Sequence, residues 1–156
     1  MANHSDRAEA LFKLGYNCAQ ATAAAFAEDF GLETSFVLKS MAGFGGGMGG
    51  LRESCGAVSA MAYLAGLHIG TYAPDDLTTK TALYDLVKKM VREFIERHGT
   101  TACRELLEKA GCLPSPDPSE RTAEYYAARP CAHIVASAAE IISSSLLPAL
   151  PAPAVR

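Results

Sequence analysis

The stretch GFGGGMGGLRESCGAVSAMAYLAGLHIG, residues 43–70, decides the fold. Its first eight residues include six glycines, and no regular helix survives that density because glycine loses the most backbone freedom on folding. From about Arg52 to Leu67 the sequence is then apolar almost all round a helix, which is typical of a helix at the centre of a bundle. The stretch therefore predicts a glycine-rich interhelical loop that leads into a central, buried helix.

The segments on both sides also carry helical patterns, and none shows the period-two alternation of a strand. The clearest amphipathic pattern runs from about Asp76 to His98, with apolar residues at three- and four-residue spacing and charged residues on the other face. Capping residues and glycine stops bound the remaining segments. The expected helices cover residues 5–14, 18–30, 34–41, 52–67, 76–98, 100–109, 120–128 and 130–147. We therefore predict an all-α fold, a compact bundle of about five to seven helices.

Length and composition fit one domain. The chain has 156 residues and can bury about 68–70% of its unfolded surface. We expect a single helical domain over residues 1–147 and a disordered tail at residues 148–156. The net charge is −3 and there is no basic run, which argues against a nucleic-acid-binding surface. With 49% hydrophobic and 20% charged residues, wholesale disorder is excluded.

The N-terminal residues lack an apolar segment and a cleavage site of the secretory type, so we expect a cytoplasmic protein. The uncharged run around Cys55 to Ile69 is too short and too rich in serine and glycine for membrane insertion. Its apolar helix suits either the core or the interface of a homodimer. In a reducing compartment, cysteines serve as thiols, transient redox disulfides or metal ligands rather than as a static disulfide framework.

Four of the five cysteines fall in the first turn of an expected helix: Cys18, Cys55, Cys103 and Cys131. Free backbone N–H groups and the positive end of the helix dipole stabilise an anion there. A thiolate is such an anion, and it is both the nucleophile and the metal-binding form of cysteine. The alternative is that these residues are buried as small hydrophobic side chains. There is no CxxC pair, so thioredoxin-like and zinc-ribbon motifs are unsupported and only the fold can bring the cysteines together.

The glycine-rich loop contains a GxGxxG pattern, but no strand precedes it, so a dinucleotide-binding site is not supported. Glycines allow a backbone to approach a ligand closely, and the loop leads into the helix that begins near Cys55. Together they could cradle an anion or a sulfur-rich cofactor. A tight crossing between helices explains the same glycines equally well. The candidate cofactor-binding glycines are Gly45, Gly46, Gly47, Gly49 and Gly56.

Five segments together resemble the redox-active protein family named for its C-GCAxxG-C-C cysteine pattern, over about Leu11 to Ser143. They are GYNCAQA (residues 15–21), GFGGGMGG (43–50), ESCGAVSA (53–60), CRELL (103–107) and RPCAHIVASAAEII (129–142). The resemblance implies that the four helix-start cysteines are the family cysteines and that Cys112 is extra. Ala60 stands where family members often have glycine. A related region occurs in split-Soret cytochromes, which associate haem and iron–sulfur chemistry, so the resemblance suggests a cofactor.

The leading hypothesis is a redox protein in which Cys18, Cys55, Cys103 and Cys131 act together. They would ligate an iron–sulfur cluster or, less in keeping with the resemblance, zinc. Alternatively, they would cycle between dithiol and disulfide without a cofactor, against a redox partner that the sequence does not identify. Either chemistry suits an oxidoreductase or an electron-transfer protein. Two other classes remain open: an anion- or small-molecule-binding module built on residues 43–50, and a structural helical dimer with buried, inert thiols.

Overall fold

The computed structural model describes residues 3–149, and within them the chain forms eight α-helices, three short 3₁₀ helices and no strand. The α-helices are α1 (His4–Lys13), α2 (Cys18–Ala24), α3 (Thr34–Met41), α4 (Gly56–Ile69), α5 (Leu77–His98), α6 (Cys103–Lys109), α7 (Ala123–Ala128) and α8 (Cys131–Leu146). The 3₁₀ helices are η1 (Glu28–Phe30), η2 (Ala42–Phe44) and η3 (Leu147–Ala149). The predicted all-α class is confirmed, with eight helices rather than five to seven.

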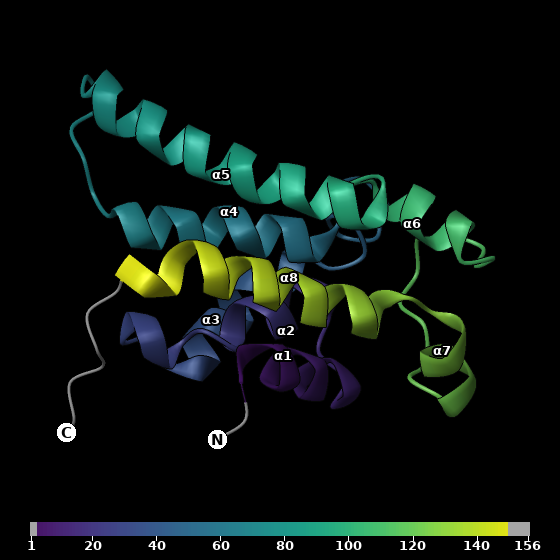
Figure 1. Ribbon diagram of the computed structural model, residues 1–156. Coiled ribbons are helices and arrows are strands. Elements are labelled where there is room, and N and C mark those ends of the chain that lie inside the picture. The colour runs from purple at the N-terminus through teal and green to yellow at the C-terminus, as the bar shows by residue number, and fades with distance from the viewer. Residues whose placement is uncertain (1–2, 150–156) are drawn as a thin grey trace.

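Helices α2, α4 and α8 pack on one another and form the centre of the bundle. Helices α1 and α3 cover this centre on one side, and α5 covers α4 and α8 on the other (Figure 1). Helices α6 and α7 lie beyond one end of the bundle, the end at which α4 and α8 begin (Figure 1). The arrangement therefore gathers several helix starts in one place.

The core reflects the sequence pattern in α4 and departs from it in α5. Ala57, Met61 and Leu64 of α4 are buried, as the apolar run predicts. The opposite side of α4 reaches the surface, so the helix is central without being buried all round. In α5 only Met90 and Phe94 are buried, because this helix lies on the outside of the bundle and contacts it along a narrow stripe.

Local signals explain most helix boundaries. Asn17 and Gln20 form a reciprocal capping box at the start of α2, and Asp76 caps α5 through the amide of Thr79. Gly99 ends α5 in the left-handed conformation. The helix predicted over residues 18–30 is shorter than expected: it ends at Ala24 and gives way to a turn and η1.

The helix predicted from Arg52 begins four residues later, at Gly56. The reason is a long-range backbone pairing. The amide of Cys55 donates to the carbonyl oxygen of Thr101 at 2.7 Å, and the amide of Cys103 donates to that of Glu53 at 2.6 Å. An isolated antiparallel bridge between Ser54 and Ala102 thereby holds residues 52–55 alongside residues 101–104 and outside the helix.

One helical stretch, Cys131–Ala149, is long and apolar enough to cross a membrane by length and composition, and half of that window is buried inside the protein. Helix α8, which makes up most of this stretch, packs against α1, α2, α4 and α5. Its apolar residues therefore have partners in the core. Of the tail predicted to be disordered, Pro148 and Ala149 lie in η3, and residues 150–156 lie outside the described residues.

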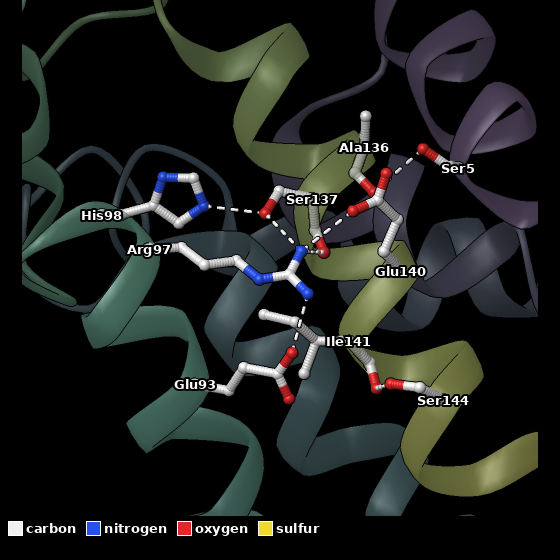
Figure 2. Close-up of polar contacts among 9 residues, drawn as sticks. All are labelled: Ser5, Glu93, Arg97, His98, Ala136, Ser137, Glu140, Ile141 and Ser144. Atoms are coloured by element: carbon white, nitrogen blue, oxygen red, sulfur yellow. Dashed lines mark hydrogen bonds and ion pairs between the residues drawn. The ribbon is translucent and has the colours of Figure 1, made fainter.

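A polar cluster joins α5 to α8 (Figure 2). The Arg97 guanidinium donates to Glu93 at 2.7 Å and to Glu140 at 2.9 Å. It also donates to the Ser137 hydroxyl at 3.2 Å, and the His98 ring nitrogen lies 3.0 Å from that hydroxyl. Every charge drawn in this cluster thus has a partner of opposite sign or a hydrogen bond.

Candidate cysteine site

Four cysteines from distant parts of the chain line one cavity of about 500 Å³. Cys18, Cys103 and Cys131 are the first residues of α2, α6 and α8, and Cys55 is the residue immediately before α4. Cys55 is buried and the other three are half-buried. The structure therefore brings together the four cysteines that the sequence singles out.

Two separate contacts bring together the segments that carry these cysteines. The backbone bridge between residues 52–55 and 101–104 places Cys55 opposite Thr101 and Cys103 opposite Glu53, so the two segments lie side by side. Packing of α2 against α8 brings together the starts of those helices, so that the thiols of Cys18 and Cys131 lie near enough for each to shift the pKa of the other.

The Cys18–Cys131 pair has an uneven proton affinity. Hydrogen bonding between the two thiols is the largest cause on both sides, and it raises the pKa of Cys18 well above its usual value while lowering the pKa of Cys131. Burial adds to the rise at Cys18 and opposes the fall at Cys131. The guanidinium groups of Arg129, Arg121 and Arg52 lower the pKa of Cys131 further. Cys131 is therefore the thiol of the pair that ionises first.

The expectation that a helix start favours the thiolate is wrong at Cys18 and Cys55. Burial raises the pKa of Cys55 to about 12, although the amides of Ala57 and Val58 act in the opposite direction. At Cys55 the free-energy cost of removing the thiolate from water exceeds the stabilisation that the free amides at the helix start provide. The pKa of Cys131 is lowered, and its cause is the neighbouring thiol and the arginines rather than its place on α8.

Arg52 is the least expected residue at the site. It is 9% exposed, and its backbone lies in the left-handed region with φ 61°, which non-glycine residues hold only where their surroundings impose it. Its Nε donates to the carbonyl oxygen of Ser115 at 2.7 Å, and its Nη1 lies 3.6 Å from the Cys103 Sγ. The guanidinium thus links the proline-rich segment LPSPDPSE, residues 113–120, to Cys103.

Two further arginines line the cavity beside an aromatic group. The guanidinium of Arg121 lies over the rings of Phe12 and Tyr125 at 4.6 and 4.7 Å, and that of Arg129 lies over Tyr125 at 4.6 Å. Arg121 Nη1 is buried and has no hydrogen-bond partner among the described residues. Stacking positions both cations without neutralising them.

All five candidate glycines line the cavity, but several are needed by the protein itself. A side chain at Gly45 would collide with Asn17, and one at Gly47 would lie 2.6 Å from the Glu53 amide nitrogen. A side chain at Gly56 would lie 2.8 Å from the backbone nitrogen of Ala19. The tight crossing of segments therefore accounts for these three glycines, independently of any ligand.

Cys112 stands apart from the other cysteines. It does not line the cavity, and its thiol donates to the carbonyl oxygen of Ala128 at 3.2 Å. Among residues 3–149, no three His, Cys, Asp or Glu side chains form a group that could hold a metal ion as they stand. The donor chemistry of the four cavity thiols nevertheless matches the Cys₄ set of iron–sulfur clusters.

Sequence reasoning missed the three arginines of the cavity. Arg129 had a signal, because it precedes Cys131 by two residues, at the start of the last helix. Arg52 and Arg121 had none, because their position depends on the left-handed turn and on the aromatic rings that the fold supplies.

Comparison with known proteins adds one finding. No curated protein and no solved structure matches the chain. A family model, "Putative redox-active protein (C_GCAxxG_C_C)", matches residues 16–145 and so covers most of the chain, including all four cavity cysteines. The protein therefore belongs to the C_GCAxxG_C_C family.

Proposed function

We propose that the protein is a thiol–disulfide redox protein in which Cys18 and Cys131 interconvert between a dithiol and a disulfide. The observation that carries this proposal is that Cys18 and Cys131 begin two helices that pack on each other and line the wall of one cavity, where each thiol shifts the pKa of the other. Because the two thiols differ in pKa, they are suited to different steps of the reaction. Cys131 ionises first and acts as the attacking thiol, and Cys18 keeps its proton until it resolves the intermediate.

The reaction transfers two electrons from the dithiol to an external disulfide. The Cys131 thiolate attacks one sulfur, the external S–S bond breaks, and a mixed disulfide forms as the other half leaves as a thiolate. Cys18 then loses its proton and attacks the Cys131 sulfur. The Cys18–Cys131 bond forms, and the second half leaves as a thiolate. The two protons of the dithiol pass through solvent to the two released thiolates.

Arg129, Arg121 and Arg52 support the first step. Their positive charges favour the Cys131 thiolate over the thiol. The cavity, at about 500 Å³, has room for a small reactant beside the two sulfurs.

A second candidate is favoured by one observation: all four family cysteines line the same cavity. In this alternative Cys18, Cys55, Cys103 and Cys131 hold an iron–sulfur cluster, which supplies one-electron transfer when bound. Since no three ligand side chains of the described chain are already arranged for a metal ion, the thiols must move to bind one. The dithiol reaction needs only the pair that already interacts, so we place it first.

One experiment separates the candidates. The protein is purified without oxygen, and its visible spectrum, iron and sulfide content and free thiols are measured on one sample. It is then treated with an excess of bis(2-hydroxyethyl) disulfide, and the products are mapped by mass spectrometry. The dithiol proposal expects colourless protein with five free thiols, of which two, Cys18 and Cys131, become joined.

A Cys112→Ser variant serves as the control, because Cys112 lies outside the cavity and should not change the mapped pair. Iron with sulfide, and absorption that bleaches on reduction, would replace the dithiol proposal with the cluster. Five thiols that react with nothing would overturn both and favour the anion-binding module or the structural dimer.

A further inference from the structure

The cavity carries positive charge that no carboxylate of the described residues balances. Arg52, Arg121 and Arg129 line it, and none of them forms an ion pair with a carboxylate of residues 3–149. The one acidic residue in the lining is Asp117, which is exposed. A guanidinium as buried as Arg52 is costly without an anion beside it.

Several hydrogen-bond donors at the cavity also lack an acceptor in the protein. Arg121 Nη1 is buried without an acceptor. The backbone amides of Gly45, Gly46 and Gly47 donate to no group within the described chain, whereas the next six amides, those of residues 48–53, all donate to carbonyl oxygens. Donors that lack partners in the protein are satisfied by ordered water or by a bound group, and a bound anion can replace that water.

We propose that the cavity selects a small disulfide bearing a carboxylate, whose oxygens are bound by Arg52 and the free amides of residues 45–47. The inference rests on the proposed function and names its substrate class. An oxyanion matches both kinds of donor, since guanidinium and backbone N–H groups bind carboxylates through charge-assisted hydrogen bonds. The position of Arg52 Nη1, 3.6 Å from the Cys103 Sγ, sets this anion next to the cysteines.

The test is a charge series of disulfides of nearly equal size: 3,3′-dithiodipropionate, bis(2-hydroxyethyl) disulfide and cystamine. Rates of thiol loss are measured at about 0.15 M ionic strength, where long-range attraction is largely screened. The rate with each disulfide is divided by the rate at which 2-mercaptoethanol reacts with the same disulfide, which corrects for the intrinsic reactivity of the disulfide. We expect the anionic disulfide to exceed the neutral one by about tenfold, the equivalent of one charged hydrogen bond, and cystamine to be slowest.

Variants locate the anion. Arg52→Gln should remove most of the preference for the anionic disulfide, and Arg52→Lys should retain part of it because the charge remains. Arg92→Gln is the matched control: Arg92 is exposed on α5, and its loss removes the same charge without altering the cavity. Melting curves verify that each variant is folded. If Arg52→Gln does not fold, the rates of the wild-type protein across the charge series still test the proposal. Equal rates for the three disulfides would contradict it.

A second measurement does not depend on redox chemistry. Binding of 3,3′-thiodipropionate, a thioether that cannot exchange, is measured by calorimetry against bis(2-hydroxyethyl) sulfide. Binding of the dicarboxylate alone supports the anion site. Equal exchange rates across the series together with no binding of the dicarboxylate overturn the anion site while leaving the proposed exchange intact. If the dicarboxylate binds but no disulfide exchanges with the protein, the proposed function is wrong. The assignment of a disulfide as the ligand is then wrong as well.

Discussion

Two polar regions lie along α8, and they treat their arginines in opposite ways. In the α5–α8 cluster, Arg97 is bound by two carboxylates and by the Ser137 hydroxyl (Figure 2). In the cysteine cavity, Arg52 is more deeply buried but reaches only a carbonyl oxygen and the sulfur of Cys103. The arginine of the first region is therefore paired with carboxylates of the protein, and the arginine of the second region pairs with none among the described residues.

The difference supports the proposal that the cavity, rather than the α5–α8 cluster, carries the chemistry. A polar network in which every member has a partner holds two helices in one arrangement. A buried charge without a carboxylate, beside thiols of uneven pKa, is expensive for stability and is found where function requires it. We therefore expect changes in the α5–α8 cluster to alter stability alone and changes in the cavity to alter reactivity.

The largest expected effect is at the cavity. Cys131→Ser should abolish reaction with bis(2-hydroxyethyl) disulfide at the pair, because the thiol that ionises first is gone. Cys18→Ser should still react once but stop at a mixed disulfide on Cys131, since no resolving thiol remains. Intact-mass spectrometry distinguishes the two outcomes. A mixed disulfide that accumulates on Cys18 in the Cys131→Ser variant would reverse the assigned roles.

The glycine loop gives the next largest effect. Gly47→Ala should destabilise the protein by about 2–4 kcal/mol, because φ is 68° and the new methyl would meet the backbone of Arg52 and Glu53. Gly66→Ala is the matched control, since that glycine lies within α4 with nothing close to its Cβ position, and it should stabilise by about 0.5–1 kcal/mol. Urea unfolding measures both. Equal effects would mean that the loop is not held rigidly against the cavity.

The fold and the site differ in how much of each could be predicted from the sequence. The bounds of α3 and the C-terminal end of α5 were predicted because the signals are local: the apolar spacing and the glycine that follows α5. The start of α4 was predicted four residues too early because residues 52–55 pair with residues 101–104. No local sequence pattern predicts a backbone pairing between segments so far apart in the chain.

The four cysteines that line the cavity could be singled out from the sequence because their order and surroundings are specific. Their pKa values were not predictable from a helix start, because burial and neighbouring thiols dominate. Arg52 was missed for a further reason. It reaches the cavity through a left-handed backbone conformation, which an arginine gives no reason to expect.

A smaller effect is expected in the α5–α8 cluster. Ser137 is 6% exposed, and Ser137→Ala would leave Arg97 and His98 each without one hydrogen-bond partner, so we expect a loss of about 1–2 kcal/mol. Ser144→Ala, exposed on the same helix, should change stability by less than about 0.5 kcal/mol. Both variants should exchange with disulfides at the wild-type rate. A slower rate in Ser137→Ala would show that the two regions of α8 are coupled.

The smallest expected effect is the pH dependence of the same cluster. Burial lowers the pKa of His98 below its usual value of 6.5, and the charges of His133, Arg97 and Lys109 act in the same direction. In the window just below pH 6.5 the unfolded chain therefore binds more protons than the folded one, so stability is present above this pH and is lost as the pH falls through it. His98→Gln should flatten the dependence of unfolding free energy on pH between about 7 and 5.5, whatever its effect at pH 7. An unchanged slope would mean that the imidazolium is accommodated beside Ser137 and Glu140, and the cluster would then be less complete than its hydrogen bonds indicate.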